Sequence, residues 1–293
     1  MFRGTFTALV TPFRDDRVDR AALELLVEAQ IAGGVSGLVA IGTTGESPTL
    51  TAAEREEVIR LVIEISNHRC KVLAGTGSNS TRTAIVATQA AEKLGADGAL
   101  VVAPYYNKPS QEGLFRHFRA IAEATALPIM LYNIPGRCAV DVSAETVQRI
   151  AEKSPNIVSI KEASGSVERV SELRARLPEQ FTILSGDDSL TLPFMAVGAV
   201  GVVSVASNVF PAEICAMVHA AERGDHQSAR KLHLKLLPFV KDLFIEPNPV
   251  PAKTALSWRG MMLKECRLPL CEMSSANEAR LRRSFDAIET AVS

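Results

Sequence analysis

The segments "PIMLYN" (128–133) and "IVSIK" (157–161) are short apolar runs separated by a stretch whose apolar residues recur at helical spacing. Continuous apolar runs of this length, bounded by Pro, Gly or polar residues, are typical of strands buried on both faces. Between them, Ser143 is a common N-cap residue type ahead of a one-faced stripe that includes Val147 and Ile150. Residues 128–161 are therefore predicted to form a strand–helix–strand unit.

The same pattern is repeated along the chain, with runs that begin 20 to 34 residues apart. Eight parallel strands that alternate with helices close into a barrel, so the predicted fold is an α/β (β/α)₈ TIM barrel. A doubly wound open sheet is the alternative, but no GxGxxG follows the first run. The eight runs are "TFTALV" from Thr5, "GLVAI" from Gly37, "KVLAG" from Lys71, "GALVVAP" from Gly98, "PIMLYN" from Pro128, "IVSIK" from Ile157, "FTILSG" from Phe181 and "GVVSV" from Gly201.

The last third of the chain has a different pattern. After about residue 208 the strand-like runs stop, and helices are predicted over 212–223, 227–243, 252–263 and 277–291. The first of these helices completes the barrel, and no linker or charge run separates the others from it. We predict a catalytic barrel at 1–223 and a C-terminal helical extension at 224–293 that packs on the barrel.

Length and composition limit the classes of protein to consider. A chain of 293 residues fits one barrel of about 250 residues with an addition. The net charge of -1 without a basic tract argues against nucleic acid or an anionic membrane as a partner. Neither a signal-like start nor a long apolar span is present, so a cytoplasmic protein is expected. Five cysteines without CxxC spacing and scattered histidines predict neither disulfides nor a metal site.

Chemistry in such a barrel is built at the C-terminal ends of the strands. Lys161 ends the run "NIVSIK", where apolar neighbours would disfavour its ammonium form and lower its pKa. An uncharged lysine amine can attack a ketone to form an imine, whose positive nitrogen withdraws electrons from the adjacent carbon. The alternatives are a lysine that extends to solvent or one that pairs with Glu162.

Other strand ends carry polar residues. "GTTGES" (42–47) can form a nest of backbone N–H groups for a carboxylate, or an ordinary turn. Tyr132 and Tyr106 carry phenols that can transfer protons, or are packed aromatic residues. Arg137 can form a bidentate pair with a carboxylate, or is simply solvated.

Several longer motifs are found in order over almost the whole chain: "GTFTALVTPF", "GTTGES", "PYYNKPSQEGL", "LYNIPGR", "IKEASG", "LSGDD" and "EPNPVPAK". In these motifs the sequence resembles the pyruvate-dependent Schiff-base aldolase family, which includes dihydrodipicolinate synthases and N-acetylneuraminate lyases. "GTTGES" and Arg137 are similar to the synthase branch, because sialate lyases lack that arginine. The resemblance implies a lyase that condenses pyruvate with L-aspartate 4-semialdehyde to 4-hydroxy-tetrahydrodipicolinate, the first committed step of diaminopimelate and lysine biosynthesis.

The resemblance also implies roles for individual residues. Lys161 would form the imine, and Tyr132 would shuttle protons through Thr43 and through Tyr106 of a neighbouring subunit. Arg137 would hold the carboxylate of the aldehyde. No cofactor is implied because the lysine is the electron sink, and the assembly implied is a homotetramer built as a dimer of dimers. The residues implied to bind pyruvate are Thr43, Thr44, Gly186 and the backbone of Val203.

The resemblance is weaker where feedback-sensitive members bind lysine. Ala52, Arg55 and Thr83 stand where those members carry histidine and glutamate, and the sequence predicts weak or absent inhibition by lysine. Two other functions are open at this point. One is a sugar-acid aldolase or another 2-keto-acid aldolase of the same family, and the other is a non-catalytic barrel that binds a small acid.

Overall fold

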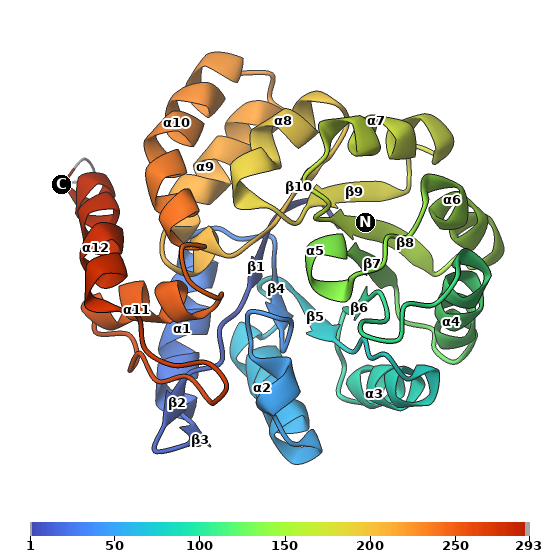
Figure 1. Ribbon diagram of the computed structural model, residues 1–293, viewed down its shortest axis with the longest axis horizontal. Coiled ribbons are helices and arrows are strands. Elements are labelled where there is room, and N and C mark those ends of the chain that lie inside the picture. Colours follow the sequence, from blue (N-terminus) through green and yellow to red (C-terminus); the bar gives the residue numbers. More distant parts are fainter. Residues whose placement is uncertain (1, 291–293) are drawn as a thin grey trace.

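The computed structural model describes residues 2–290, and its centre is a closed barrel of parallel strands. The strands follow the order β1-β10-β9-β8-β7-β6-β5-β4 around the barrel, and β1 pairs with both β10 and β4 (Figure 1). This closure confirms the predicted TIM barrel and excludes the open sheet. The barrel strands are β1 (Gly4–Ala8), β4 (Gly37–Ala40), β5 (Lys71–Gly75), β6 (Gly98–Val102), β7 (Ile129–Asn133), β8 (Ile157–Glu162), β9 (Thr182–Ser185) and β10 (Gly201–Ser204).

One helix outside the barrel follows each strand. The cap predicted at Ser143 is confirmed, because its side chain accepts from the backbone of Thr146. Asp19 likewise accepts from the backbone of Ala22, and Thr51 and Glu54 form a reciprocal capping box. A hairpin of β2 (Phe13–Arg14) and β3 (Arg17–Val18) after β1 was not predicted. The covering helices are α1 (Arg20–Ala32), α2 (Ala52–Ser66), α3 (Thr81–Lys93), α4 (Gln111–Glu123), α6 (Ala144–Lys153), α7 (Val167–Arg176), α8 (Thr191–Ala196) and α9 (Pro211–Glu222).

The C-terminal region contains α10 (His226–Asp242), α11 (Val250–Trp258) and α12 (Ser275–Glu289). α10 packs on α9, α11 contacts the short helix η3 (Ala206–Asn208) that follows β10, and α12 contacts α10 and α11 (Figure 1). The helix predicted over 252–263 ends earlier because Gly260, at φ +67°, turns the chain. The predicted end of the last helix at Ala291 lies outside the described residues, and the division at 223/224 stays a prediction.

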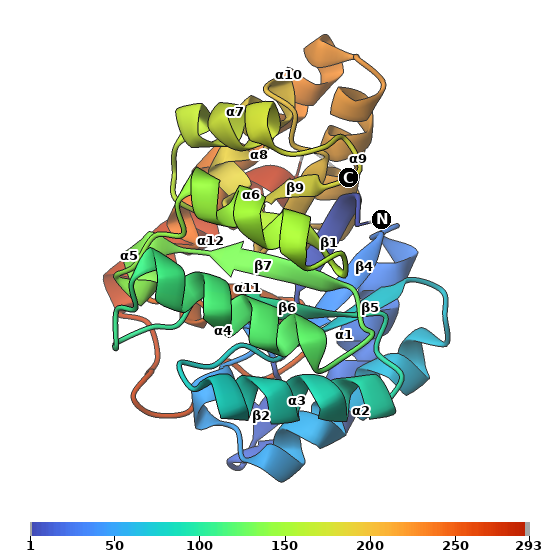
Figure 2. The same ribbon diagram turned by 90° about the vertical axis from the view of Figure 1, so that its right-hand side faces the viewer.

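Side-chain alternation along the strands decides what faces the barrel interior. Met130 and Tyr132 on β7 belong to the inner cluster, whereas Leu131 packs in the layer between the strands and the helices. Figure 2 shows β7 from the side, with its arrowhead toward the end of the barrel where the short helix α5 (Pro135–Cys138) lies. Within residues 2–290, no helix combines the length and apolarity that crossing a bilayer requires.

Candidate active site

Lys161 lies on β8 with its side chain inside the barrel, and only 5% of the residue is exposed. Tyr132 is its register partner on β7, and the lysine Nζ lies 4.2 Å from the centroid of the tyrosine ring. Burial lowers the pKa of Lys161 to about 8, and the nearby positive charge of Arg137 acts in the same direction. Asp188 opposes this shift. Lys161 is therefore a partly uncharged amine near neutral pH, as the sequence predicted.

The alternative in which Lys161 pairs with Glu162 is wrong. Successive residues of a strand point to opposite faces, so the Glu162 side chain lies outside the barrel. Its carboxylate accepts from the side chain of Asn133 at 3.1 Å and from the backbone of Ser164 at 2.8 Å, and it faces the Arg169 guanidinium at 3.5 Å. These contacts fix the ends of β7 and β8 relative to each other, and thereby Tyr132 relative to Lys161.

Tyr132 closes one side of a small cavity that it shares with Thr43, Ser47 and Val102. Burial raises the pKa of the phenol, while the Arg137 charge and a hydrogen bond with Thr43 act in the opposite direction. The phenol therefore keeps its proton at neutral pH. The phenol hydrogen-bonds with Thr43, and its ring lies beside the Lys161 amine.

The threonine loop, defined as residues 42–47, follows β4 at the mouth of the barrel. Its turn is closed by backbone bonds from Gly45 to Gly42 and from Glu46 to Thr43, each 3.1 Å long. A Cβ at Gly45 would lie 3.0 Å from the Ile41 Cα and would crowd the backbone there. Thr44 is buried, and its Oγ1 accepts from the Asn248 side chain at 2.9 Å.

Gly186 and Val203 complete the surroundings of the lysine. A Cβ at Gly186 would meet the Lys161 Cε at 3.0 Å and the Ala163 Cβ at 2.7 Å, so only glycine leaves room for the lysine side chain. Val203 on β10 is fully buried in the inner cluster. The structure thus places both Gly186 and Val203 inside the barrel with Lys161.

Two residues of this region were not predicted from the sequence. The Asp188 carboxylate is buried and accepts from the backbone of Val205 at 2.8 Å and from the Ser204 hydroxyl. Its negative charge partly opposes the lowering of the Lys161 pKa by burial. Asn248 lies in the turn-rich segment "EPNPVP". The sequence predicted a break between two helices there, but it did not predict the contact with Thr44.

Arg137 and Tyr106 lie at the outer edge of this site. Arg137 is an exposed residue of α5, and its charge reaches both Lys161 and Tyr132. Tyr106 is 90% exposed and has a left-handed backbone at φ 74°. Within one chain the structure does not bring Tyr106 to Thr43 or Tyr132.

The comparisons with known proteins agree with this geometry. The model of the Dihydrodipicolinate synthetase family matches residues 1–288 of the chain. The chain belongs to the dihydrodipicolinate synthetase family. A 4-hydroxy-tetrahydrodipicolinate synthase of Sorangium cellulosum is 54% identical over 288 residues, which are 98% of this chain and 96% of that protein.

Two solved structures of the dihydrodipicolinate synthetase family are similar over their full length. The 4-hydroxy-tetrahydrodipicolinate synthase of Methylacidiphilum fumariolicum SolV has a TM-score of 0.98 at 55% identity, with 99% of this chain and 97% of that chain covered. A dihydrodipicolinate synthase of Cyanidioschyzon merolae, solved with lysine bound, has a TM-score of 0.96 at 44% identity, with 98% of each chain covered.

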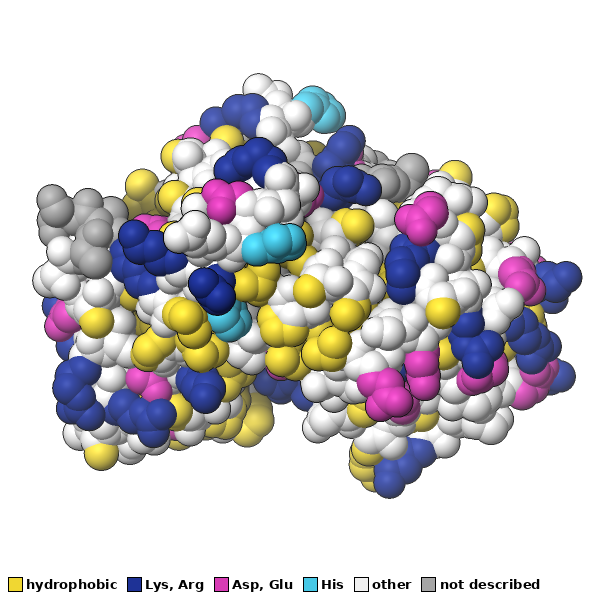
Figure 3. Space-filling view, turned by 90° about the horizontal axis from the view of Figure 1, so that it is seen from above, with side chains coloured by type: hydrophobic (Ala, Val, Ile, Leu, Met, Phe, Trp, Pro, Cys, Tyr) yellow, Lys and Arg dark blue, Asp and Glu magenta, His cyan; other side chains and the backbone are white. Residues whose placement is uncertain are grey.

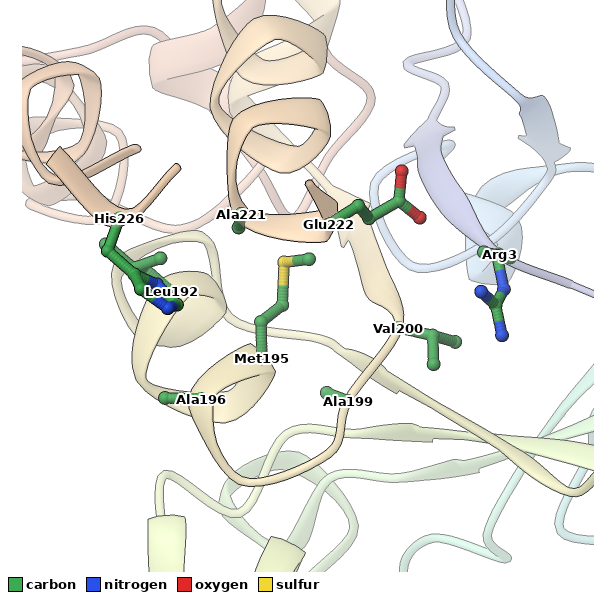
Figure 4. Close-up of a pocket in the computed structure, with 9 residues that line it drawn as sticks. All are labelled: Arg3, Leu192, Met195, Ala196, Ala199, Val200, Ala221, Glu222 and His226. Carbon is green, nitrogen blue, oxygen red and sulfur yellow. The ribbon is translucent and has the colours of Figure 1, made fainter. Parts of the chain in front are cut away.

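A larger cavity of about 260 Å³ lies at the opposite end of the barrel of this dihydrodipicolinate synthetase family member. Met195, Ala199 and Val200 form its apolar wall, and Arg3, Glu222 and His226 also line it (Figure 4). The face seen from above carries a central band of hydrophobic side chains between charged margins (Figure 3). This cavity is near the starts of β1 and β10, the end that serves stability rather than chemistry in such barrels.

Burial of Lys161 has a cost in stability that a substitution would reveal. The folded pKa of about 8 lies below the ordinary 10.5, so the folded state carries an unfavourable buried ammonium at pH 7. Lys161→Met is expected to raise the free energy of unfolding at pH 7 by about 3 kcal/mol, at 1.36 kcal/mol per pKa unit. The gain is full below pH 8 and declines toward pH 10.5, because the wild-type lysine then loses its proton in the folded state first.

Urea unfolding of Lys161→Met and wild type from pH 6 to 10.5 measures this effect. Lys231→Met, a change at an exposed position of α10, is the control and should give no comparable gain. A difference between Lys161→Met and wild type that stays constant across this pH range would contradict the lowered pKa.

Proposed function

We propose that this protein is a 4-hydroxy-tetrahydrodipicolinate synthase that joins pyruvate to L-aspartate 4-semialdehyde through an imine on Lys161. The observation that carries the proposal is the buried amine of Lys161, which lies against Tyr132, and Tyr132 in turn shares a cavity with Thr43 of the threonine loop. The family membership and the relatives at about 50% identity support the same reaction. The lysine supplies the electron sink, so no step requires an external cofactor.

In the first half of the proposed reaction, the Lys161 Nζ attacks the keto carbon of pyruvate. The oxygen leaves as water with protons supplied through Tyr132, and an imine forms. Thr43 and Thr44 hold the pyruvate carboxylate, and Gly186 and Val203 shape the pocket around it. The Tyr132 phenolate left by this proton transfer then removes a proton from the methyl group, the C–H electrons move into the imine, and an enamine forms while the phenol is restored.

In the second half, the enamine carbon attacks the aldehyde carbon of aspartate semialdehyde and a C–C bond forms. Tyr132 gives its proton to the oxygen that becomes the hydroxyl. The amine of the semialdehyde then attacks the imine carbon, the bond to Lys161 breaks, and the ring product leaves with the lysine amine restored. Arg137 at the mouth forms a bidentate pair with the semialdehyde carboxylate.

The exposed Tyr106 supports a relay completed by a second copy of the chain. A tyrosine that is 90% exposed in one chain can enter the site of a neighbour, where it would connect Thr43 to solvent. We therefore propose a dimer as the catalytic unit and a homotetramer, a dimer of dimers, as the assembly. We place this biosynthetic enzyme in the cytoplasm.

The choice between aspartate semialdehyde and a sugar acid depends on Arg137. Arg137→Met is expected to raise KM for aspartate semialdehyde at least tenfold, since a charged hydrogen bond contributes about 1.5–3 kcal/mol. The KM for pyruvate should change less than threefold. Steady-state assays with both substrates measure this difference, and wild-type turnover of N-acetylneuraminate or a keto-deoxy sugar acid in place of aspartate semialdehyde would support the alternative aldolase.

Ala52, Arg55 and Thr83 line one cleft of about 160 Å³ between α2 and α3, with Glu56 at its exposed edge. Arg55 brings a positive charge to this cleft, and its guanidinium donates to the Ser47 carbonyl at 2.7 Å. A lysine ammonium is therefore disfavoured here. We expect 5 mM lysine to reduce turnover by less than twofold, and strong inhibition in the same assay would overturn this prediction.

A further inference from the structure

We propose that the C-terminal extension positions the threonine loop through a buried ion pair between Lys253 and Glu46. Lys253 on α11 is fully buried, and its Nζ donates to a Glu46 carboxylate oxygen and to the Glu265 carbonyl at 2.8 Å. The same Nζ lies 4.2 Å from the centroid of the Phe13 ring. The second carboxylate oxygen of Glu46 accepts from the backbone of Arg267 at 3.0 Å. Both oxygens of a loop residue are thus held by the extension.

Glu46, the loop residue held by these contacts, also has a strained backbone. Glu46 has a left-handed backbone at φ 54°, which non-glycine residues adopt only where their surroundings enforce it. Its backbone N–H bonds the Thr43 carbonyl, so the conformation of Glu46 sets the direction of the turn that presents Thr43 and Thr44. A buried charge pair with fixed partners is suited to holding such a turn.

A second contact from the extension acts on the loop independently. The Asn248 side chain donates to the Thr44 Oγ1 at 2.9 Å, and Asn248 precedes α11 on the same segment. Because the hydroxyl oxygen accepts from Asn248, the hydroxyl proton of Thr44 is directed elsewhere and is free for an anion. On the proposed function, that anion is the pyruvate carboxylate.

Lys253 and Asn248 are accordingly positioning residues, which act on pyruvate only through the loop. Lys253→Met is expected to raise KM for pyruvate at least tenfold, with the rate of imine reduction at saturating pyruvate within threefold of wild type. Asn248→Ala should change the same two quantities in the same directions. The matched control is Arg280→Met, which breaks an ion pair with Asp242 inside the extension, 2.7 Å long and with no part in the loop.

Lys253→Met leaves the Glu46 charge buried without its partner, and this variant can fail to fold. The double variant Glu46→Leu with Lys253→Met removes both charges and avoids that problem. It is expected to fold and to keep the raised KM, because the loop has still lost its anchor. A folded Lys253→Met or double variant with the wild-type KM for pyruvate would overturn the inference.

Hydrogen–deuterium exchange of the backbone amides in residues 42–47 tests the inference without any substrate. Exchange should be at least tenfold faster in the double variant than in wild type or Arg280→Met. Equal exchange would overturn the positioning role whatever the enzyme acts on. Faster exchange in the double variant, found together with a wild-type protein that forms no imine with pyruvate, would contradict the proposed function and leave the positioning role supported.

Discussion

Lys161→Ala is expected to lower the turnover of pyruvate and aspartate semialdehyde by about 10⁴-fold or more, because no other group in the site can form the covalent intermediate. The methyl side chain retains the pocket formed by Gly186 and Val203, so pyruvate can still be bound. Loss of the amine removes the imine and with it the electron sink for C–C bond formation.

Product formation by purified wild type and Lys161→Ala measures this loss. Lys231→Ala is the control, because it removes an exposed lysine of α10 that is remote from the barrel mouth. Lys161→Ala removes a buried ammonium, which offsets part of the stability that a large-to-small core substitution loses. The urea midpoint of this variant should therefore fall no further than for an ordinary core truncation. Activity of Lys161→Ala within tenfold of wild type would show that the reaction uses another nucleophile.

Tyr132→Phe is expected to lower kcat by about 10²–10⁴-fold, the usual contribution of a positioned proton donor. The ring that packs beside Lys161 is kept, and only the hydroxyl that hydrogen-bonds with Thr43 is removed. The pyruvate imine should still form, but more slowly, because its water must leave without the phenol.

Borohydride reduction at a series of pyruvate concentrations separates these effects. The maximal rate of trapping should fall in Tyr132→Phe, while the concentration of pyruvate that gives half of it should change little. A variant that turns over within fivefold of wild type would exclude Tyr132 as the proton donor and leave it a packing role.

The barrel could be predicted from the sequence because most strand residues are buried on both faces, so each strand is a short and mainly apolar run. Placement of Lys161 and Tyr132 followed from the same runs, since residues at strand ends of a parallel barrel meet at one mouth. The hairpin at residues 13–18 escaped detection because its strands have two residues each. Its signal was the pair Asp15–Asp16, both with positive φ, as a two-residue hairpin turn requires.

The supports of the threonine loop could not be predicted from the sequence. Glu46 and Lys253 are 207 residues apart, and Thr44 and Asn248 are 204 residues apart. Contacts between residues so far apart in the chain produce no local periodicity or motif in the sequence. The residues around Tyr106 did not show that it is exposed, and only the family resemblance implied that it acts in a neighbouring subunit.

The most direct test of the account is reduction of the protein with sodium borohydride in the presence of pyruvate, followed by mass spectrometry of the digested chain. The account predicts one reduced pyruvate adduct, located on Lys161, and none in Lys161→Ala. An unmodified chain, or an adduct on a different lysine, would contradict it.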